Sequence, residues 1–161
     1  MLTLTLPPDI AERVQKALIR SGKREIGGVM MGEHVGFDSF VVRDLTVHRR
    51  GTFASFVRRI EEAWASLSQF FDKTRWDYQR FNYIGEWHSH PCYEPFPSPR
   101  DHRSMMEIAL DRSVGANFVA LMIVKLTTRG ALDGTVHTYL PDGRCEESQL
   151  VIQGCSGRDN E

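Results

Sequence analysis

The sequence predicts a single domain of mixed α/β architecture, in which strands and helices alternate along the chain. The chain has 161 residues, which is enough for one hydrophobic core of ordinary size. Residues 116–126 form a nearly continuous apolar run rich in β-branched side chains, which is typical of a central strand. Residues 53–71 instead carry a stripe of apolar side chains at positions 53, 57, 60, 64, 67 and 71, and these intervals of three and four match the period of an amphipathic helix.

Local periodicity and turn residues predict the other elements. Strands are expected at residues 2–6, 26–35, 40–47, 81–90, 135–140 and 146–152, and helices at residues 7–22 and 99–110. Glycines in the strand at 26–35 indicate that another group approaches its backbone closely. Core packing best explains the aromatic side chains of the helix at 53–71. We assign residues 1–152 to the domain and 153–161 to a flexible C-terminal tail, because this end is polar.

Composition argues against several classes of function. A net charge of −1 gives no electrostatic case for binding nucleic acid or an anionic membrane. No apolar run is long enough to span a membrane, and the N-terminal residues lack the features of a signal peptide. Cys92, Cys145 and Cys155 are widely spaced, so they form neither a disulfide framework nor a Cys-x-x-Cys pair. We expect a cytoplasmic protein without nucleic-acid or membrane partners.

The segment from His88 to Asp101 contains a candidate metal site. His88 and His90 lie two residues apart at the end of a predicted strand, so both can face one ion. Ser98 is a good N-cap and Pro99 suits the first helical position, so Asp101 falls in the first turn of the next helix. Two imidazole nitrogens and one carboxylate oxygen suit zinc, with a fourth position left for water.

Each half of this pattern also has an ordinary explanation. A His-x-His pair occurs by chance, and Ser98-x-x-Asp101 resembles a capping box that begins a helix. The two roles of Asp101 are compatible, because a helix start is a rigid place from which to aim a carboxylate. His102 is next to Asp101 and is a candidate to support it. The other histidines are interpreted as ordinary surface or core residues: His34, His48 and His137.

These residues resemble the JAMM motif of the MPN metallopeptidases: an upstream glutamate, His-x-His, seven residues, and Ser-x-x-Asp. In this chain His88-Ser89-His90 is followed by the seven residues 91–97 and then by Ser98-Pro99-Arg100-Asp101, without insertion or gap. The upstream element is similar too, as Glu25-Ile26-Gly27-Gly28-Val29-Met30-Met31-Gly32. The resemblance implies a curved mixed β-sheet flanked by helices, similar to the deaminase-like fold.

The resemblance also implies a role for each motif residue. His88, His90 and Asp101 would bind zinc. Glu25 would act as the general base, taking a proton from water and passing it to the leaving amine. Ser98 would donate a hydrogen bond to the oxyanion of the tetrahedral intermediate.

The general base has two candidates. Glu25 follows Lys23 and Arg24, and by itself it would be interpreted as a solvated surface charge. Glu86 lies two residues before His88 on the same predicted strand and nominally on the same face. We prefer Glu25 because the family pattern places the base on a neighbouring strand.

The implied activity is that of a zinc-dependent isopeptidase or peptidase that cleaves after the C-terminus of a ubiquitin-like protein, in deconjugation or precursor processing. The segment Gly85-Glu86-Trp87-His88-Ser89-His90-Pro91 resembles stand-alone prokaryotic JAMM proteins. Those are often encoded beside ubiquitin-activating-like and conjugating-like enzymes in antiphage operons. The implied partners are therefore a ubiquitin-like protein or its conjugates, including a conjugated immune sensor. The activating-like and conjugating-like enzymes of the same operon are implied partners too.

Two alternatives remain for the function. The first is a non-catalytic MPN scaffold, which is disfavoured because all five motif residues are present. The second is a zinc hydrolase of small peptides or sulfur-carrier adducts. The long segment at residues 48–80 favours a protein substrate over a small molecule, because it offers a large docking surface.

Overall fold

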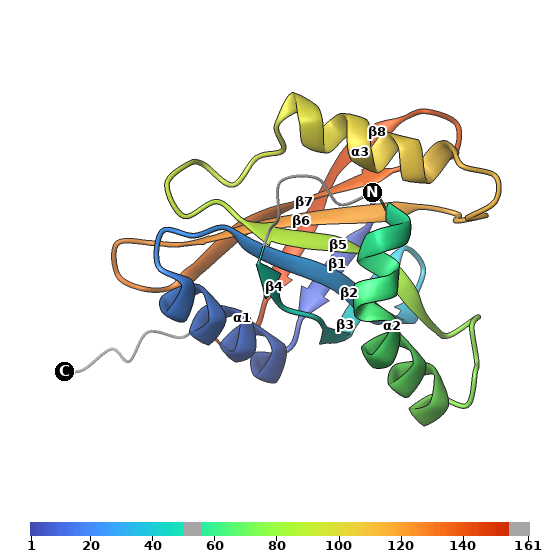
Figure 1. The fold of residues 1–161 in the computed structure, drawn as a ribbon, viewed down its shortest axis with the longest axis horizontal. Helices are drawn as coiled ribbons and strands as arrows, with labels where there is room; N and C mark the ends of the chain where they lie inside the picture. The colour runs from blue at the N-terminus through green and yellow to red at the C-terminus, as the bar shows by residue number, and fades with distance from the viewer. Residues whose placement is uncertain (50–55, 155–161) are drawn as a thin grey trace.

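The computed structural model describes residues 1–49 and 56–154 (Figure 1). It confirms one domain of mixed α/β architecture. The elements in chain order are β1 (Thr3–Leu6), α1 (Pro8–Ser21), β2 (Ile26–Gly36), β3 (Ser39–Leu45), β4 (His48–Arg49), α2 (Phe56–Lys73), β5 (Phe81–Ser89), α3 (Pro99–Leu110), β6 (Val119–Leu126), β7 (Leu132–Tyr139) and β8 (Cys145–Ile152). Of the predicted tail, all but Gln153 and Gly154 lies outside the described residues.

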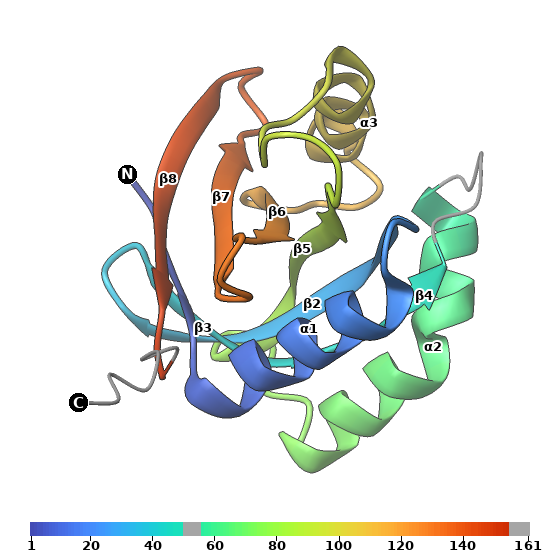
Figure 2. The ribbon, with the colours of Figure 1, turned by 90° about the vertical axis from the view of Figure 1, so that its left-hand side faces the viewer.

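The strands form one mixed sheet that closes on itself. Their order is β3-β1-β8-β7-β6-β5-β2-β4, and β2 also pairs with β3. Strand β1 runs parallel to β3 and β8, and β5 runs parallel to β6, whereas the other pairs are antiparallel. Figure 2 shows the resulting curvature from β8 through β5 to β2 and β3. A curved mixed sheet was expected, but its closure, in which β1 joins β3 to β8, was not.

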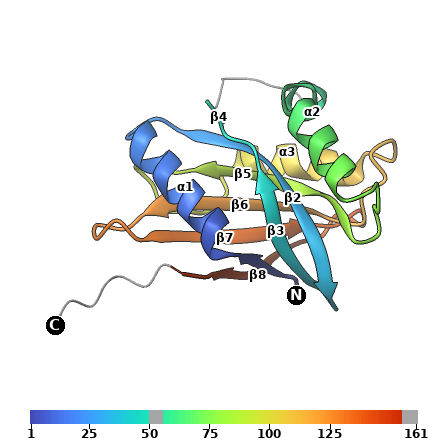
Figure 3. The same cartoon turned by 90° about the horizontal axis from the view of Figure 1, so that it is seen from below.

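Each helix covers a different part of the sheet (Figures 1 and 3). Helix α1 packs on the largest hydrophobic cluster, which includes Leu4 of β1, Trp87 of β5 and Met122 of β6. Helix α3 packs against β6 and β7 around Met105. Helix α2 packs against β2 and β5. Among the described residues, no helix combines the length and apolar character needed to cross a membrane.

The predicted core face of α2 is largely confirmed. Leu67 and Phe71 are buried, together with Ala63 and Phe70, against β2. Trp64 is a correction to the predicted stripe, because its exposed fraction is 55%. The buried face runs through positions 63, 67 and 70–71, and residue 64 lies one helical step of about 100° from residue 63, at the edge of this face. The side chains at positions 53 and 57 of the predicted stripe are outside the described part of the chain.

Candidate metal centre

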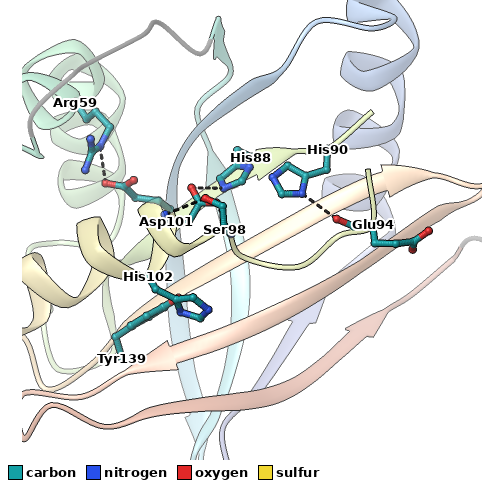
Figure 4. Close-up of polar contacts among 9 residues, drawn as sticks. Arg59, His88, His90, Glu94, Ser98, Asp101, His102 and Tyr139 are labelled. Carbon is teal, nitrogen blue, oxygen red and sulfur yellow. Dashed lines mark hydrogen bonds and ion pairs between the residues drawn. The ribbon is translucent and has the colours of Figure 1, made fainter. Parts of the chain in front are cut away.

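His88, His90 and Asp101 come together where β5 ends and α3 begins (Figure 4). Their candidate ligand atoms all lie within 4.8 Å of one another, and all three residues are buried. Nε2 of His88 lies 3.2 Å from Oδ1 of Asp101. Buried titratable side chains are normally paired with one another or bound to a metal. The structure thus brings together the three ligands that the sequence predicted.

The loop after β5 fixes the ring of His90. Its Nδ1 lies 2.9 Å from the backbone carbonyl oxygen of Glu94, as Figure 4 shows. A carbonyl oxygen can only accept a hydrogen bond, so Nδ1 carries a proton, and in the neutral ring Nε2 then presents its lone pair. Metal-binding histidines commonly donate their second ring N–H to a carbonyl in this way. The orientation of His90 therefore suits coordination through Nε2.

Ser98 holds the side chain of Asp101 at the start of α3. The backbone amide and the hydroxyl of Ser98 both donate to Oδ2 of Asp101, at 2.8 and 2.7 Å. The Ser98 Oγ in turn accepts from the Asp101 amide at 3.2 Å, which completes a capping box. The capping interpretation of Ser98-x-x-Asp101 is therefore correct. It is also compatible with ligation, because Oδ2 serves the cap while Oδ1 faces His88.

The pairing of β2 with β5 brings Glu25 toward the same centre. Gly27 of β2 lies opposite His88 in the antiparallel register. Continuing this register by two residues places Glu25 opposite His90, on the face that carries both histidines. Glu25 is half-buried at this position, just before β2 begins. Of the two candidate bases, Glu25 is thus the one beside the strand that neighbours β5, and its role as the base stays a prediction.

Two contacts fix the end of β2 against β5. A side chain at Gly27 would bring its Cβ to 2.9 Å from the Cβ of His88, so only glycine allows the strands to approach this closely. The amide of Ile26 donates to the hydroxyl of the buried Ser89 at 3.0 Å. Ser89 lies between the two histidines on the opposite face, and the sequence alone gave it no role. Through this hydrogen bond Ser89 positions Ile26, the residue that follows Glu25.

The alternative base, Glu86, is held by a guanidinium group. Its Oε1 accepts from Nε of Arg59 at 2.7 Å, which ties β5 to helix α2. This charge-assisted hydrogen bond occupies one oxygen of the carboxylate. Glu86 is therefore suited to anchor α2 more than to transfer protons.

His102 interacts with β7. Its Nδ1 lies 2.8 Å from the hydroxyl of Tyr139, and Figure 4 shows these two side chains together. Its ring meets that of His137 edge-on, with the ring centroids 6.0 Å apart. Burial raises the pKa of Tyr139, so its hydroxyl stays protonated, and the His102 tautomer decides which of the two groups donates. Burial likewise lowers the pKa of His137, which favours its neutral form. His102 was expected to be a candidate for supporting Asp101, but its described contacts instead join α3 to β7.

Comparison with known proteins identifies the family. The model of the prokaryotic homologues of the JAB domain matches residues 8–133, which include every residue of the site. The chain belongs to this family. The resemblance to the JAMM motif is thereby confirmed at the level of the family.

Two relatives extend the comparison. The CD-NTase/cGAS isopeptidase of Enterobacter hormaechei subsp. hoffmannii (strain UCI 50) is 28% identical over 116 residues, which cover 68% of this chain and 59% of that protein. The match thus spans less than two thirds of the relative. The solution structure of a Desulfitobacterium hafniense protein has a TM-score of 0.64 and 18% identity, and the match covers 93% of this chain and 92% of that one. This second likeness concerns the fold alone.

Proposed function

We propose that this protein is a zinc-dependent isopeptidase of the JAMM type, with a deaminase-like fold in residues 1–152. The observation that carries the proposal is the convergence of two imidazoles and one carboxylate, buried within 4.8 Å of one another. A half-buried glutamate precedes the neighbouring strand. Membership of the JAB family supports the same conclusion.

The donor set fits zinc. His88, His90 and Asp101 would hold the ion through two nitrogens and one oxygen, which is a common set for a catalytic zinc that keeps one position open. When bound, zinc supplies a Lewis acid and lowers the pKa of water to about 7. The tautomer of His90 and the cap on Asp101 orient two of these ligands before any ion arrives.

The remaining motif residues would move protons and stabilise charge. Glu25 takes the proton of the attacking water and delivers it to the leaving amine, which is a poor leaving group unless protonated. The hydroxyl of Ser98 turns from Asp101 toward the substrate oxygen, where it stabilises the oxyanion. The backbone amide of Ser98 can keep Asp101 in place during this turn, because it donates to the same Oδ2.

The proposed substrate is a protein joined to, or extended beyond, the C-terminus of a ubiquitin-like protein. The name of the Enterobacter relative, a CD-NTase/cGAS isopeptidase, supports a conjugated immune sensor as the target. On this proposal, activating-like and conjugating-like enzymes would be further partners. The free, exposed cysteines Cys92 and Cys145 support activity in the reducing cytoplasm.

The decisive experiment separates metal binding from catalysis. The substrate is a fusion of a candidate ubiquitin-like tail to a reporter, incubated with and without a chelator. We expect His88→Ala to lose zinc and cleavage together, whereas Glu25→Gln retains zinc and loses cleavage. The matched control is His34→Ala, because His34 is exposed and stacks on Phe40. Active protein without stoichiometric metal would refute the zinc mechanism, and full turnover by metal-loaded Glu25→Gln would assign the base to another group.

A further inference from the structure

A groove of about 460 Å³ lies between helix α1 and the edge formed by β4 and the start of β2. Its lining contains five permanent cations: Arg13, Lys16, Arg20, Arg24 and Arg49. The described residues that line the groove include no carboxylate. Because the whole chain has a net charge of −1, this positive charge is a local concentration and not a general property of the surface.

Helix α1 sets the spacing of the cations. Its core face carries Ile10, Val14 and Leu18, which are buried. Arg13, Lys16 and Arg20 recur at intervals of three and four beside that face, so they form a row along the groove. From residue 13 to residue 20 this row is about 10 Å long.

Only part of this charge is neutralised within the protein. Arg13 forms an ion pair with Asp44 at 2.8 Å, and Lys16 forms one with Glu12 at 2.8 Å. Within residues 1–49 and 56–154, Arg20, Arg24 and Arg49 form no ion pair. Like charges gathered in one groove repel one another, and an anionic occupant would relieve this repulsion.

The groove reaches the proposed catalytic strand. Ile26 lines it, directly follows Glu25 and pairs with Arg49 of β4. Figures 1 and 2 show that the α1–β2 connection and β4 lie at the same end of the sheet as the end of β5. A chain lying in the groove would therefore run toward the bond that Glu25 and the histidines act upon.

We propose that this groove binds an acidic segment of the protein substrate, beside the bond that is cleaved. That the bound segment belongs to a substrate rests on the proposed function. Cations one helical turn apart are spaced by about 5–6 Å, and their long side chains can reach carboxylates about 7 Å apart on alternate residues of an extended peptide. Arginine side chains bind phosphate as well as carboxylate, but many phosphate sites add backbone amides at a helix N-terminus or in a nest. The groove adjoins the middle and C-terminal part of α1, so an extended acidic peptide is favoured over a phosphorylated small molecule.

Binding can be measured without turnover by fluorescence anisotropy. The probe is a fluorescein-labelled peptide of alternating Glu and Gly, and its matched control has Gln in place of Glu. We expect the Glu peptide to bind, with an affinity that falls as salt is added, and the Gln peptide not to bind. Arg20→Glu should weaken binding about 10-fold, whereas Arg20→Lys should retain it within about twofold. The control variant Arg112→Glu reverses the charge of an exposed side chain beyond the end of α3, and its affinity for the Glu peptide should equal that of wild type.

The same variants are then assayed for cleavage of a substrate with an acidic flank. Arg20→Glu should raise KM and leave kcat unchanged. Equal binding of the Glu peptide by wild type and Arg20→Glu, or no binding by wild type, would overturn the proposal. Displacement of the peptide by micromolar ATP, but not by unlabelled Glu peptide, would reassign the groove to phosphate ligands. Peptide binding without any metal-dependent cleavage would count against the proposed function alone, since the anisotropy assay needs no zinc.

Discussion

Two buried carboxylates in this protein have opposite surroundings. Glu33 of β2 and Asp101 of α3 have exposed fractions of 6% and 5%. Each oxygen of Glu33 accepts from an arginine: Oε1 from Arg80 at 2.6 Å and Oε2 from Arg43 at 2.7 Å. At Asp101, by contrast, Oδ2 accepts from Ser98 while Oδ1 faces an imidazole.

This difference separates a structural carboxylate from a candidate ligand. Burial alone would raise the pKa of Glu33, but its hydrogen bonds to Arg80 and Arg43 outweigh burial and lower the pKa below its ordinary value. Fixed guanidinium groups thus occupy both oxygens and join β2 to β3 and to the segment before β5. Asp101 instead keeps one oxygen directed at the histidines. The degree of burial does not mark a functional carboxylate, whereas the chemistry of its neighbours does.

Removing the charge of Asp101 should have the largest effect. Asp101→Asn keeps the shape of the side chain and an oxygen for the Ser98 cap, but it offers the ion a neutral amide. We expect zinc to be lost and cleavage to fall more than about 1,000-fold, because several kcal/mol of charge stabilisation are removed. Elemental analysis and the fusion-cleavage assay measure both effects. Retention of full activity with zinc would show that Asp101 is as structural as Glu33.

Removing the Ser98 hydroxyl should have an intermediate effect. We expect Ser98→Ala to retain zinc, because the backbone amide of Ser98 still donates to Asp101. Turnover should fall about 100- to 1,000-fold, the usual cost of one oxyanion donor. Loss of the cap should also lower the free energy of unfolding by about 1 kcal/mol. If Ser98→Ala loses stability but turns over substrate as fast as wild type, the role of Ser98 is only to cap α3.

Glu33→Gln should change stability and leave the chemistry intact. The variant loses charge-assisted hydrogen bonds to two arginines, so the free energy of unfolding should fall by about 1–3 kcal/mol at pH 7. Cleavage by the folded protein should stay within about twofold of wild type. Urea denaturation and the cleavage assay at a temperature where both proteins are folded give the two values. A large loss of activity in fully folded, zinc-loaded Glu33→Gln would show that Glu33 is not purely structural and does not differ from Asp101 in this way.

The stability difference between wild type and Glu33→Gln should depend on pH. The pKa of Glu33 is lower in the folded protein than its ordinary value, so its contribution is present above about pH 4.3. As the pH falls through the folded pKa, the carboxylate is protonated and this contribution disappears. Urea denaturation from pH 7 down to pH 3 should therefore show the two proteins converging. A constant difference across this range would mean that the ionised form of Glu33 is not what the arginines stabilise.

The same two carboxylates explain what could be predicted from sequence. The cap of Asp101 lies three residues away, so a local pattern predicts both the helix start and the ligand, and α3 has the expected limits Pro99–Leu110. The partners of Glu33 are ten and forty-seven residues away, at Arg43 and Arg80. No local periodicity encodes such a pair. Closure of the sheet was missed for the same reason, because it depends on β1 pairing with β8 from the other end of the domain.

Within the site, the contacts that sequence reasoning missed involve backbone groups. The carbonyl of Glu94 fixes His90, and the amide of Ile26 is held by Ser89. Every residue type carries a backbone amide or carbonyl, except that proline lacks the amide hydrogen, so no side-chain pattern predicts either contact. A serine between two candidate ligands on a strand was the one available signal, because alternation directs it to the opposite face.

The strand at the start of the chain also bears on how the domain folds. Strand β1 lies between β3 and β8, and Thr3 pairs with Gln149 across 146 residues. Joining two segments so far apart in the sequence has a high entropic cost of loop closure and raises the contact order, and both effects slow folding. Strand β5, at whose end the candidate centre lies, is separated from β1 by β2 and β3 on one side and by β6, β7 and β8 on the other. The β2–β3 hairpin and the β5–α3–β6 crossover can therefore form from segments that are closer in sequence, before β1 and β8 are joined.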